Sequence, residues 1–248
     1  MTGPPRSAAA RGRSSQHSPK ERLASAAPSP ISWWNGLTPR TKLIAAAVLL
    51  AVLTWFFWPS QLSRVTNLDS RGANVIAFGD SLTAGYGAAA GEDYPSKLSA
   101  LMSEAIINAG VSGDTTEAAL ARLEPDVLSR DPRIVIVGLG GNDYLRRVDI
   151  GSTEAALRAM VRRIHDAGAM VVILGFRFPS FGPSYETMYE RVASEEKCLL
   201  IPDLLDGVLS DPALRSDAIH PNARGYELMA ERVSGPLRKL MAKADAKR

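Results

Sequence analysis

The sequence has very little cysteine or histidine. Cys198 is its single cysteine in 248 residues, so no disulfide can form within the chain. This suits the cytoplasm, or an envelope domain that folds without disulfide bridges. The three histidines, His17, His165 and His220, argue against a multi-histidine metal site. The composition therefore predicts no multi-histidine metal centre.

Positive charge is scarce outside the N-terminal segment. The whole chain carries a formal net charge of +3. Residues 1–42 contain seven basic residues and one acidic residue, so the rest of the chain carries a net charge of −3. A mildly acidic domain argues against a nucleic-acid-binding face, and we expect no nucleic-acid partner.

The N-terminal part of the chain differs in composition from the rest. Residues 1–40 are rich in Ala, Ser, Pro and Arg without apolar periodicity, which predicts a disordered basic tail. The sixteen residues from Leu43 to Trp58 carry no charge and would span roughly 24 Å as a helix, somewhat less than a bilayer core. We interpret residues 41–59 as a single transmembrane helix or uncleaved signal anchor, residues 60–72 as a linker and residues 73–248 as one folded domain.

The charges beside this apolar run predict its orientation. Arg40 and Lys42 lie on its N-terminal side, so the basic tail is expected in the cytoplasm and the folded domain on the periplasmic or extracytoplasmic side of the inner membrane. A cleaved signal peptide, which would leave a secreted or periplasmic protein, is the alternative. The long upstream tail and the lack of a small-x-small cleavage site argue against it. A buried core helix fits poorly, because nothing polar interrupts the run.

Five short apolar runs alternate with amphipathic segments after residue 73. The runs predict strands at about 74–78, 106–108, 133–139, 170–174 and 198–201, and the segments between and after them predict helices at about 94–104, 115–123, 152–167, 185–196 and 222–239. This alternation predicts an α/β fold, a three-layer α/β/α sandwich around a five-stranded parallel sheet. Right-handed crossovers leave few topologies, and among them we expect the flavodoxin-like strand order 2-1-3-4-5. The first three strands are then neighbours, and the residues that follow them meet at one edge.

Ser81 lies just past the first of these strands. Gly79 allows a sharp turn, and Asp80 or Ser81 can cap the helix that follows. Ligands of open parallel sheets bind at this edge, where backbone N–H groups can hold a developing negative charge. For an isolated Gly-x-Ser sequence, however, a simple helix cap is the commoner interpretation.

A serine hydroxyl needs a base within hydrogen-bond reach, and the base needs an orienting acceptor. Asp217 and His220 supply both after the last strand, because an i, i+3 pair in a helical turn lies on one side. Pro221 favours a position for His220 at the start of a helix. The alternative is that Asp217 only precedes a helix and His220 is a surface loop residue.

Donors for an oxyanion are available at the ends of the first three strands. The natural set is the Ser81 N–H, the Gly113 N–H and the Asn142 side-chain amide. Separately, Gly113 could simply form a turn and Asn142 could simply cap a helix. Their joint occurrence at three successive strand ends favours the catalytic interpretation.

Together these residues resemble the SGNH, or GDSL, hydrolase family. Its four blocks are matched in order by Gly79-Asp80-Ser81-Leu82, Ser112-Gly113-Asp114-Thr115, Gly141-Asn142-Asp143 and Asp217-x-x-His220. The resemblance runs from about Val75 to the final helix. Residues 108–115 and 211–214 are similar to the arylesterase, acyl-CoA thioesterase I and lysophospholipase subgroup. The α/β-hydrolase elbow Gly-x-Ser-x-Gly is not matched, because Thr83 stands where the second glycine belongs.

The resemblance implies a serine esterase that hydrolyses carboxylic esters or thioesters through an acyl-serine, without metal or cofactor. It implies Ser81 as nucleophile, His220 as general base and then acid, and Asp217 as the residue that orients His220. It implies an oxyanion hole of Ser81, Gly113 and Asn142, and a small acyl-ester or lipid substrate. Two alternatives remain: an envelope polysaccharide O-deacetylase of the same fold, and a catalytically silent membrane-anchored binding module. The intact serine, histidine and aspartate argue against the second.

Overall fold

The computed structural model describes residues 38–57 (with side chains to residue 49), 61–177 and 184–248. Its sheet has five parallel strands in the order β2-β1-β3-β4-β5. The strands are β1 (Asn74–Gly79), β2 (Ile106–Gly110), β3 (Pro132–Gly138), β4 (Met170–Leu174) and β5 (Leu199–Ile201). The predicted α/β fold and strand order are therefore confirmed.

The strands form because most of their residues are apolar, and these side chains are buried on both faces of the sheet. Every residue of β3 and β4 is buried, and both strands are rich in Val and Ile. Such continuous apolar runs are typical of parallel strands covered by helices on each side. The sheet is the centre of the core, and it fixes the edge at which the strands end.

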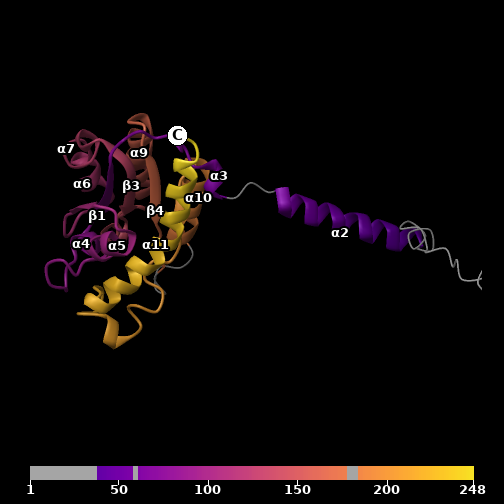
Figure 1. Ribbon diagram of the computed structural model, residues 1–248. Coiled ribbons are helices and arrows are strands. Elements are labelled where there is room, and N and C mark those ends of the chain that lie inside the picture. The colour runs from indigo at the N-terminus through magenta and orange to yellow at the C-terminus, as the bar shows by residue number, and fades with distance from the viewer. Residues whose placement is uncertain (1–37, 58–60, 178–183) are drawn as a thin grey trace, which may run out of the picture. The chain divides into compact units, whose positions relative to one another are not determined.

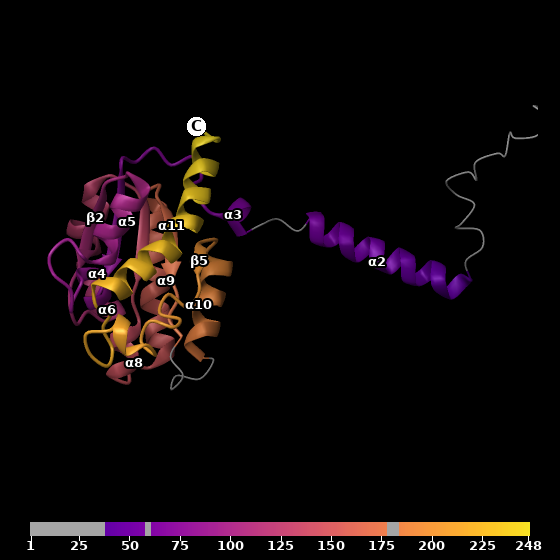
Figure 2. The ribbon, with the colours of Figure 1, turned by 60° about the horizontal axis from the view of Figure 1, so that its bottom comes forward.

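Helices cover the sheet on both faces (Figures 1 and 2). Helices α5 and α11 pack together, as do α6 with α9 and α9 with α10. The helices of this domain are α3 (Gln61–Arg64), α4 (Ser81–Ala84), α5 (Tyr94–Met102), α6 (Thr116–Ala121), α7 (Leu123–Asp126), α8 (Gly141–Leu145), α9 (Ile150–Asp166), α10 (Ser184–Glu195) and α11 (Ala223–Asp245), with short 3-10 helices η2 (Leu128–Arg130) and η4 (Pro212–Leu214).

Helix boundaries follow capping side chains. The Thr115 side chain accepts a hydrogen bond from the Ala118 N–H at the start of α6, and Asn222 accepts from two N–H groups at the start of α11. Helix α9 begins at Ile150, before the predicted start, because Asp149 rather than Ser152 caps it. The short helices α4 and α8 have no apolar periodicity, and the sequence did not predict α8.

The segment predicted as a linker is part of this domain. Residues 61–72 include α3, and Val65 is only 5% exposed within the core. The Asn67 side chain donates to the carbonyls of His165 and Ala169 at 2.8 and 3.0 Å. The folded region thus starts near residue 61 rather than 73. A four-residue helix is too short to show periodicity in a sequence.

The chain divides into two compact units, residues 1–58 and 59–248. In the first, helix α2 spans Pro39–Phe57, over most of the predicted membrane segment. No helix within the described residues has the length and apolar character needed to cross a membrane. The predicted transmembrane helix is therefore not supported; its charge-free stretch is shorter than the ~30 Å of a bilayer core. Residues 1–37 of the predicted disordered tail lie outside the described residues.

Candidate active site

Three glycines in register bring Ser81 to the sheet edge. Gly79 at the end of β1 pairs with Gly110 of β2 and with Gly138 of β3. A Cβ on Gly79 would lie 2.5 Å from the Gly138 carbonyl oxygen, and one on Gly110 would lie 2.2 Å from the Ala84 backbone nitrogen. Because Gly79 and Gly110 have no Cβ, α4 can pack directly against the ends of the strands. Ser81 is its first residue.

Ser81, His220 and Asp217 form one hydrogen-bonded chain. The Nε2 atom of His220 lies 3.0 Å from the Ser81 hydroxyl oxygen. Its Nδ1 atom lies 2.8 Å from one carboxylate oxygen of Asp217 and 3.1 Å from the other. The structure thus brings together the three predicted catalytic residues, in the arrangement by which a base activates a serine hydroxyl.

The Asp217 carboxylate also organises its own loop. One of its oxygens accepts the backbone N–H groups of Ile219 and His220, each at 2.8 Å. The Ile219 N–H, followed by the His220 side chain, lowers the pKa of Asp217, so this carboxylate stays ionised and keeps its acceptor role. The loop is a turn closed by these bonds, not the helical turn that the spacing predicted.

The predicted oxyanion donors are also present at this edge. Within the described residues, neither the Ser81 N–H nor the Gly113 N–H donates to a protein acceptor, so both are available to a substrate. Gly113 has a φ of +88°, a left-handed conformation that suits glycine. The Asn142 amide donates to the Asp114 carbonyl at 3.0 Å and weakly to the Asp80 carboxyl at 3.4 Å. A substrate oxygen would have to displace the longer of these two contacts.

Three acidic residues of the matched blocks, Asp80, Asp114 and Asp143, are buried. Asp80 is 2% exposed and caps α4 by accepting the Leu82 N–H at 3.0 Å. Burial raises the pKa of Asp80 to about 7, with smaller contributions from the charges of Asp114 and Asp143. Asp143 is fully buried and accepts hydrogen bonds from Thr116 and Thr153, which tie α8 to α6 and α9.

One arginine, Arg122, connects the ends of β1 and β2 to the loop that contains Gly113, and the sequence did not predict this role. Arg122 donates to the carbonyl oxygens of Gly79 and Ala109 at 3.0 Å each, and these residues lie at the ends of β1 and β2. It also pairs with Asp114 at 2.6 Å, beside Gly113. These bonds join the loop that contains Gly113 to the end of β1, the strand that precedes Ser81. No local pattern indicates contacts so distant in sequence.

Two further residues at the site were not predicted. The Tyr86 ring lies 4.5 Å from the His220 ring, centre to centre, and the Tyr86 carbonyl accepts the Tyr226 hydroxyl at 2.7 Å. Arg146 donates to the Gly113 carbonyl at 2.7 Å. Arg146 is four residues after Asn142, a helical spacing that could have indicated a shared side, whereas Tyr86 offered no signal.

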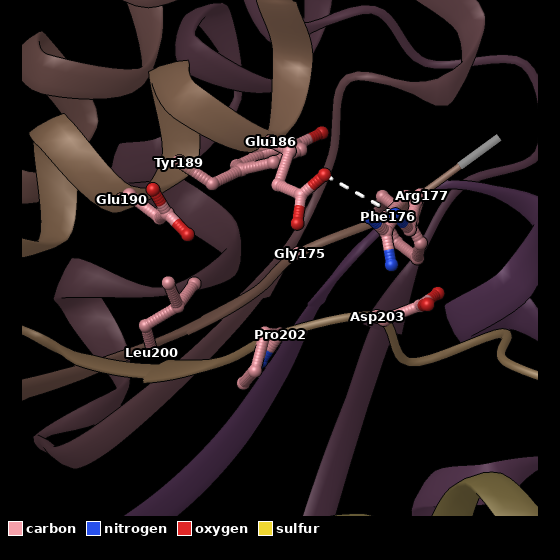
Figure 3. A pocket seen from close by; sticks show the side chains of 9 residues that line it. All are labelled: Gly175, Phe176, Arg177, Glu186, Tyr189, Glu190, Leu200, Pro202 and Asp203. Carbon is pink, nitrogen blue, oxygen red and sulfur yellow. Dashed lines mark ion pairs between the residues drawn. The ribbon is translucent and has the colours of Figure 1, made fainter. Parts of the chain in front are cut away.

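A separate small hollow lies at the ends of β4 and β5, and it contains none of the catalytic residues (Figure 3). Arg177 and Glu186 form an ion pair across it at 3.2 Å. Burial raises the pKa of Asp203 on its far side, as does the nearby charge of Asp206. Across the described residues, no group of His, Cys, Asp or Glu side chains could hold a metal ion.

Comparisons with known proteins agree with this geometry. The model of the GDSL-like lipase/acylhydrolase family matches residues 77–228. The thioesterase 1/protease 1/lysophospholipase L1 of Escherichia coli K12 is 31% identical over 175 residues, covering 67% of this chain and 84% of that protein. An arylesterase of Vibrio mimicus is 32% identical over 201 residues, covering 77% and 98%.

A solved structure agrees as well. The crystal structure of TesA superposes with a TM-score of 0.64 at 30% identity, covering 67% of this chain and 99% of that one. The names of these relatives correspond to the subgroup that the sequence resembles. On the matched residues and the shared fold, the chain belongs to the GDSL-like lipase/acylhydrolase family and is an ester-hydrolysing enzyme.

Proposed function

We propose that the protein hydrolyses acyl esters and thioesters through an acyl-enzyme formed on Ser81. The observation that carries this proposal is the continuous chain from the Ser81 hydroxyl through His220 to Asp217, with bonds of 3.0 and 2.8 Å. The relatives named arylesterase, thioesterase and lysophospholipase support acyl esters and thioesters as the substrate class.

In the first half of the reaction, the Ser81 oxygen attacks the ester carbonyl while His220 Nε2 takes its proton. Asp217 accepts a hydrogen bond from Nδ1 and so stabilises the imidazolium. The N–H groups of Ser81 and Gly113 and the Asn142 amide stabilise the oxyanion. As the tetrahedral intermediate collapses, the alcohol or thiol leaves with the proton from His220.

The second half of the reaction repeats these roles with water. Water attacks the acyl-serine as His220 removes its proton, and the carboxylic acid departs as the Ser81 hydroxyl is restored. Asn142 must turn one N–H from Asp80 to the oxyanion in each half. The 3.4 Å length of that contact makes it the weaker of the two bonds to break.

The test is hydrolysis of p-nitrophenyl esters, from acetate to long acyl chains, by the full chain and by Ser81→Ala. We expect Ser81→Ala to lower kcat by at least about a thousandfold, as removal of a catalytic serine does. Ser194→Ala is the matched control, because Ser194 is exposed on α10, a helix that contains none of the proposed catalytic or oxyanion residues. Full activity of Ser81→Ala would disprove the acyl-serine proposal.

The same series distinguishes the remaining alternative. An O-deacetylase would hydrolyse only the acetate and other short esters, and would release acetate from envelope polysaccharide. Activity that rises with acyl-chain length would favour the esterase, thioesterase and lysophospholipase types.

We also propose that the catalytic domain lies on the extracytoplasmic side. Arg40 and Lys42 before an apolar run support this orientation, whether the leader is retained or removed. Fusion of alkaline phosphatase to the C-terminus tests it, since that reporter is active only outside the cytoplasm. An inactive fusion that is nonetheless present at full length would contradict the proposal.

A further inference from the structure

Arg146 places a positive charge beside the oxyanion loop. It follows α8 directly, and its Nη2 atom lies 2.7 Å from the Gly113 carbonyl oxygen. A Cβ on Gly113 would lie only 3.4 Å from the same nitrogen, so the guanidinium rests against the loop. Because the Gly113 N–H is one of the proposed oxyanion donors, Arg146 is bonded to a residue that we expect to contact the substrate's reacting group.

The guanidinium is not neutralised by the protein. In the described part of the chain, Arg146 forms no ion pair. Asp114, the carboxylate adjacent to Gly113, is paired with Arg122 at 2.6 Å. Asp143 is buried and accepts from Thr116 and Thr153 instead. The side chain of Arg146 is exposed and donates one hydrogen bond, to the Gly113 carbonyl. Most of its N–H donors therefore remain free.

An unpaired guanidinium with free N–H groups is suited to a phosphate. Its planar fork donates two parallel hydrogen bonds to phosphate oxygens, and this geometry is more specific than a point charge. The position is notable because the chain after residue 42 has a net charge of −3. The domain as a whole therefore does not attract anions, whereas Arg146 provides a local positive charge beside Gly113.

We infer that Arg146 binds a phosphate carried by the leaving group, and so favours phosphate-bearing acyl esters over neutral ones. This inference rests on the proposed function and names its substrate class. Two sources share the chemistry, a lysophospholipid and an acyl-CoA. The glycerophosphate of a lysophospholipid has its phosphorus close to the ester carbonyl, whereas the pantetheine arm of acyl-CoA holds its phosphates far from the thioester. The proximity of Arg146 to Gly113 assigns the glycerophosphate.

The experiment compares substrates that carry phosphate with counterparts that lack it. The pairs are a 1-acylglycerol 3-phosphate with the corresponding 1-monoacylglycerol, and an acyl-CoA with the corresponding acyl-pantetheine. The ratio of kcat/KM within each pair is measured for the full chain, Arg146→Met and Arg146→Lys. Hydrogen bonds to charged groups lead us to expect Arg146→Met to lower the ratio about tenfold or more in the glycerol pair, with a partial recovery in Arg146→Lys.

Arg147→Met is the matched control. Arg147 is the next residue, is also exposed and carries the same charge, and its side chain makes no hydrogen bond or ion pair with the described residues. We expect its ratio to change by less than about threefold, because exposed charges are screened over about 8 Å at physiological salt.

Each outcome has a distinct meaning. A selective loss in the acyl-CoA pair instead would assign the phosphate to coenzyme A. Equal losses on the phosphate-bearing and neutral members would show that Arg146 only supports the Gly113 loop, and would overturn the inference. The same holds if Arg147→Met matches Arg146→Met. Failure of the unaltered chain to hydrolyse any of the four substrates would reject the proposed function itself.

Discussion

The buried carboxyl group of Asp80 makes the stability of the domain depend on pH. Its pKa rises from 3.8 in the unfolded chain to about 7 in the folded protein, chiefly because the group is removed from water. The folded state therefore holds this proton more tightly than the unfolded state between pH 3.8 and about 7. Asp80 costs nothing below that window, and its contribution to stability falls as the pH rises through it.

The magnitude follows from these two pKa values. Each pKa unit corresponds to about 1.4 kcal/mol, so the full cost above pH 7 is at most about 4 kcal/mol. Part of the cost is already present at pH 5, and the increase between pH 5 and pH 8 is about 2.5 kcal/mol. Asp80→Asn removes the charge but keeps an oxygen that can accept the Leu82 N–H.

We therefore expect the stability of Asp80→Asn, measured relative to the unaltered chain, to rise by about 2.5 kcal/mol between pH 5 and pH 8. In thermal unfolding this is a relative increase in Tm of roughly 5–10 °C for a domain of this size. Effects of the substitution on packing and on Asn142 do not depend on pH and cancel in this difference. A relative stability that stays the same at both pH values would refute the argument that Asp80 carries a buried charge.

Two further predictions concern close contacts near the site. We expect Tyr86→Leu to lower kcat about three- to tenfold, because the aromatic contact with His220 is lost. Tyr86→Phe retains the ring and should keep most of the activity. Equal losses of activity in steady-state assays of both variants would contradict this role of Tyr86. We expect Gly110→Ala to destabilise the domain by about 3 kcal/mol or more, because its Cβ would lie 2.2 Å from the Ala84 nitrogen. Urea unfolding would measure this loss, and an unchanged free energy of unfolding would contradict the close contact.

The features that could be predicted from the sequence are those with local signals. Buried parallel strands are continuous apolar runs, so β1, β3 and β4 were found within a residue or two of their ends. The right-handed crossover rule then left few topologies, and the flavodoxin-like order that we chose among them is the one observed. Because the first three strands are adjacent, Ser81, Gly113 and Asn142 were expected at one edge, and the structure places them there.

The features that could not be predicted depend on tertiary contacts. Arg122 reaches Gly79 across 43 sequence positions, and nothing near either residue indicates that bond. Val65 joins the core from a segment too short to show a helical pattern. Asp217 and His220 were paired correctly by spacing, but the backbone between them is a hydrogen-bonded turn rather than a helix. Propensity gives the elements, whereas long-range hydrogen bonds set the loops that connect them.

The nucleophile and the base of this enzyme rest on supports of unequal strength. Ser81 begins helix α4, directly after the central strand β1. Asp217 and His220 belong instead to a loop whose regular structure is the three-residue η4 and one bridge between Arg215 and Pro221. Segments with few buried contacts open at a lower free energy than the core. We therefore expect heat or denaturant to inactivate the enzyme before the sheet unfolds, because His220 can move away from Ser81 while the sheet persists. The working lifetime of the enzyme is then a property of this loop, and engineering for durability would begin there rather than in the core.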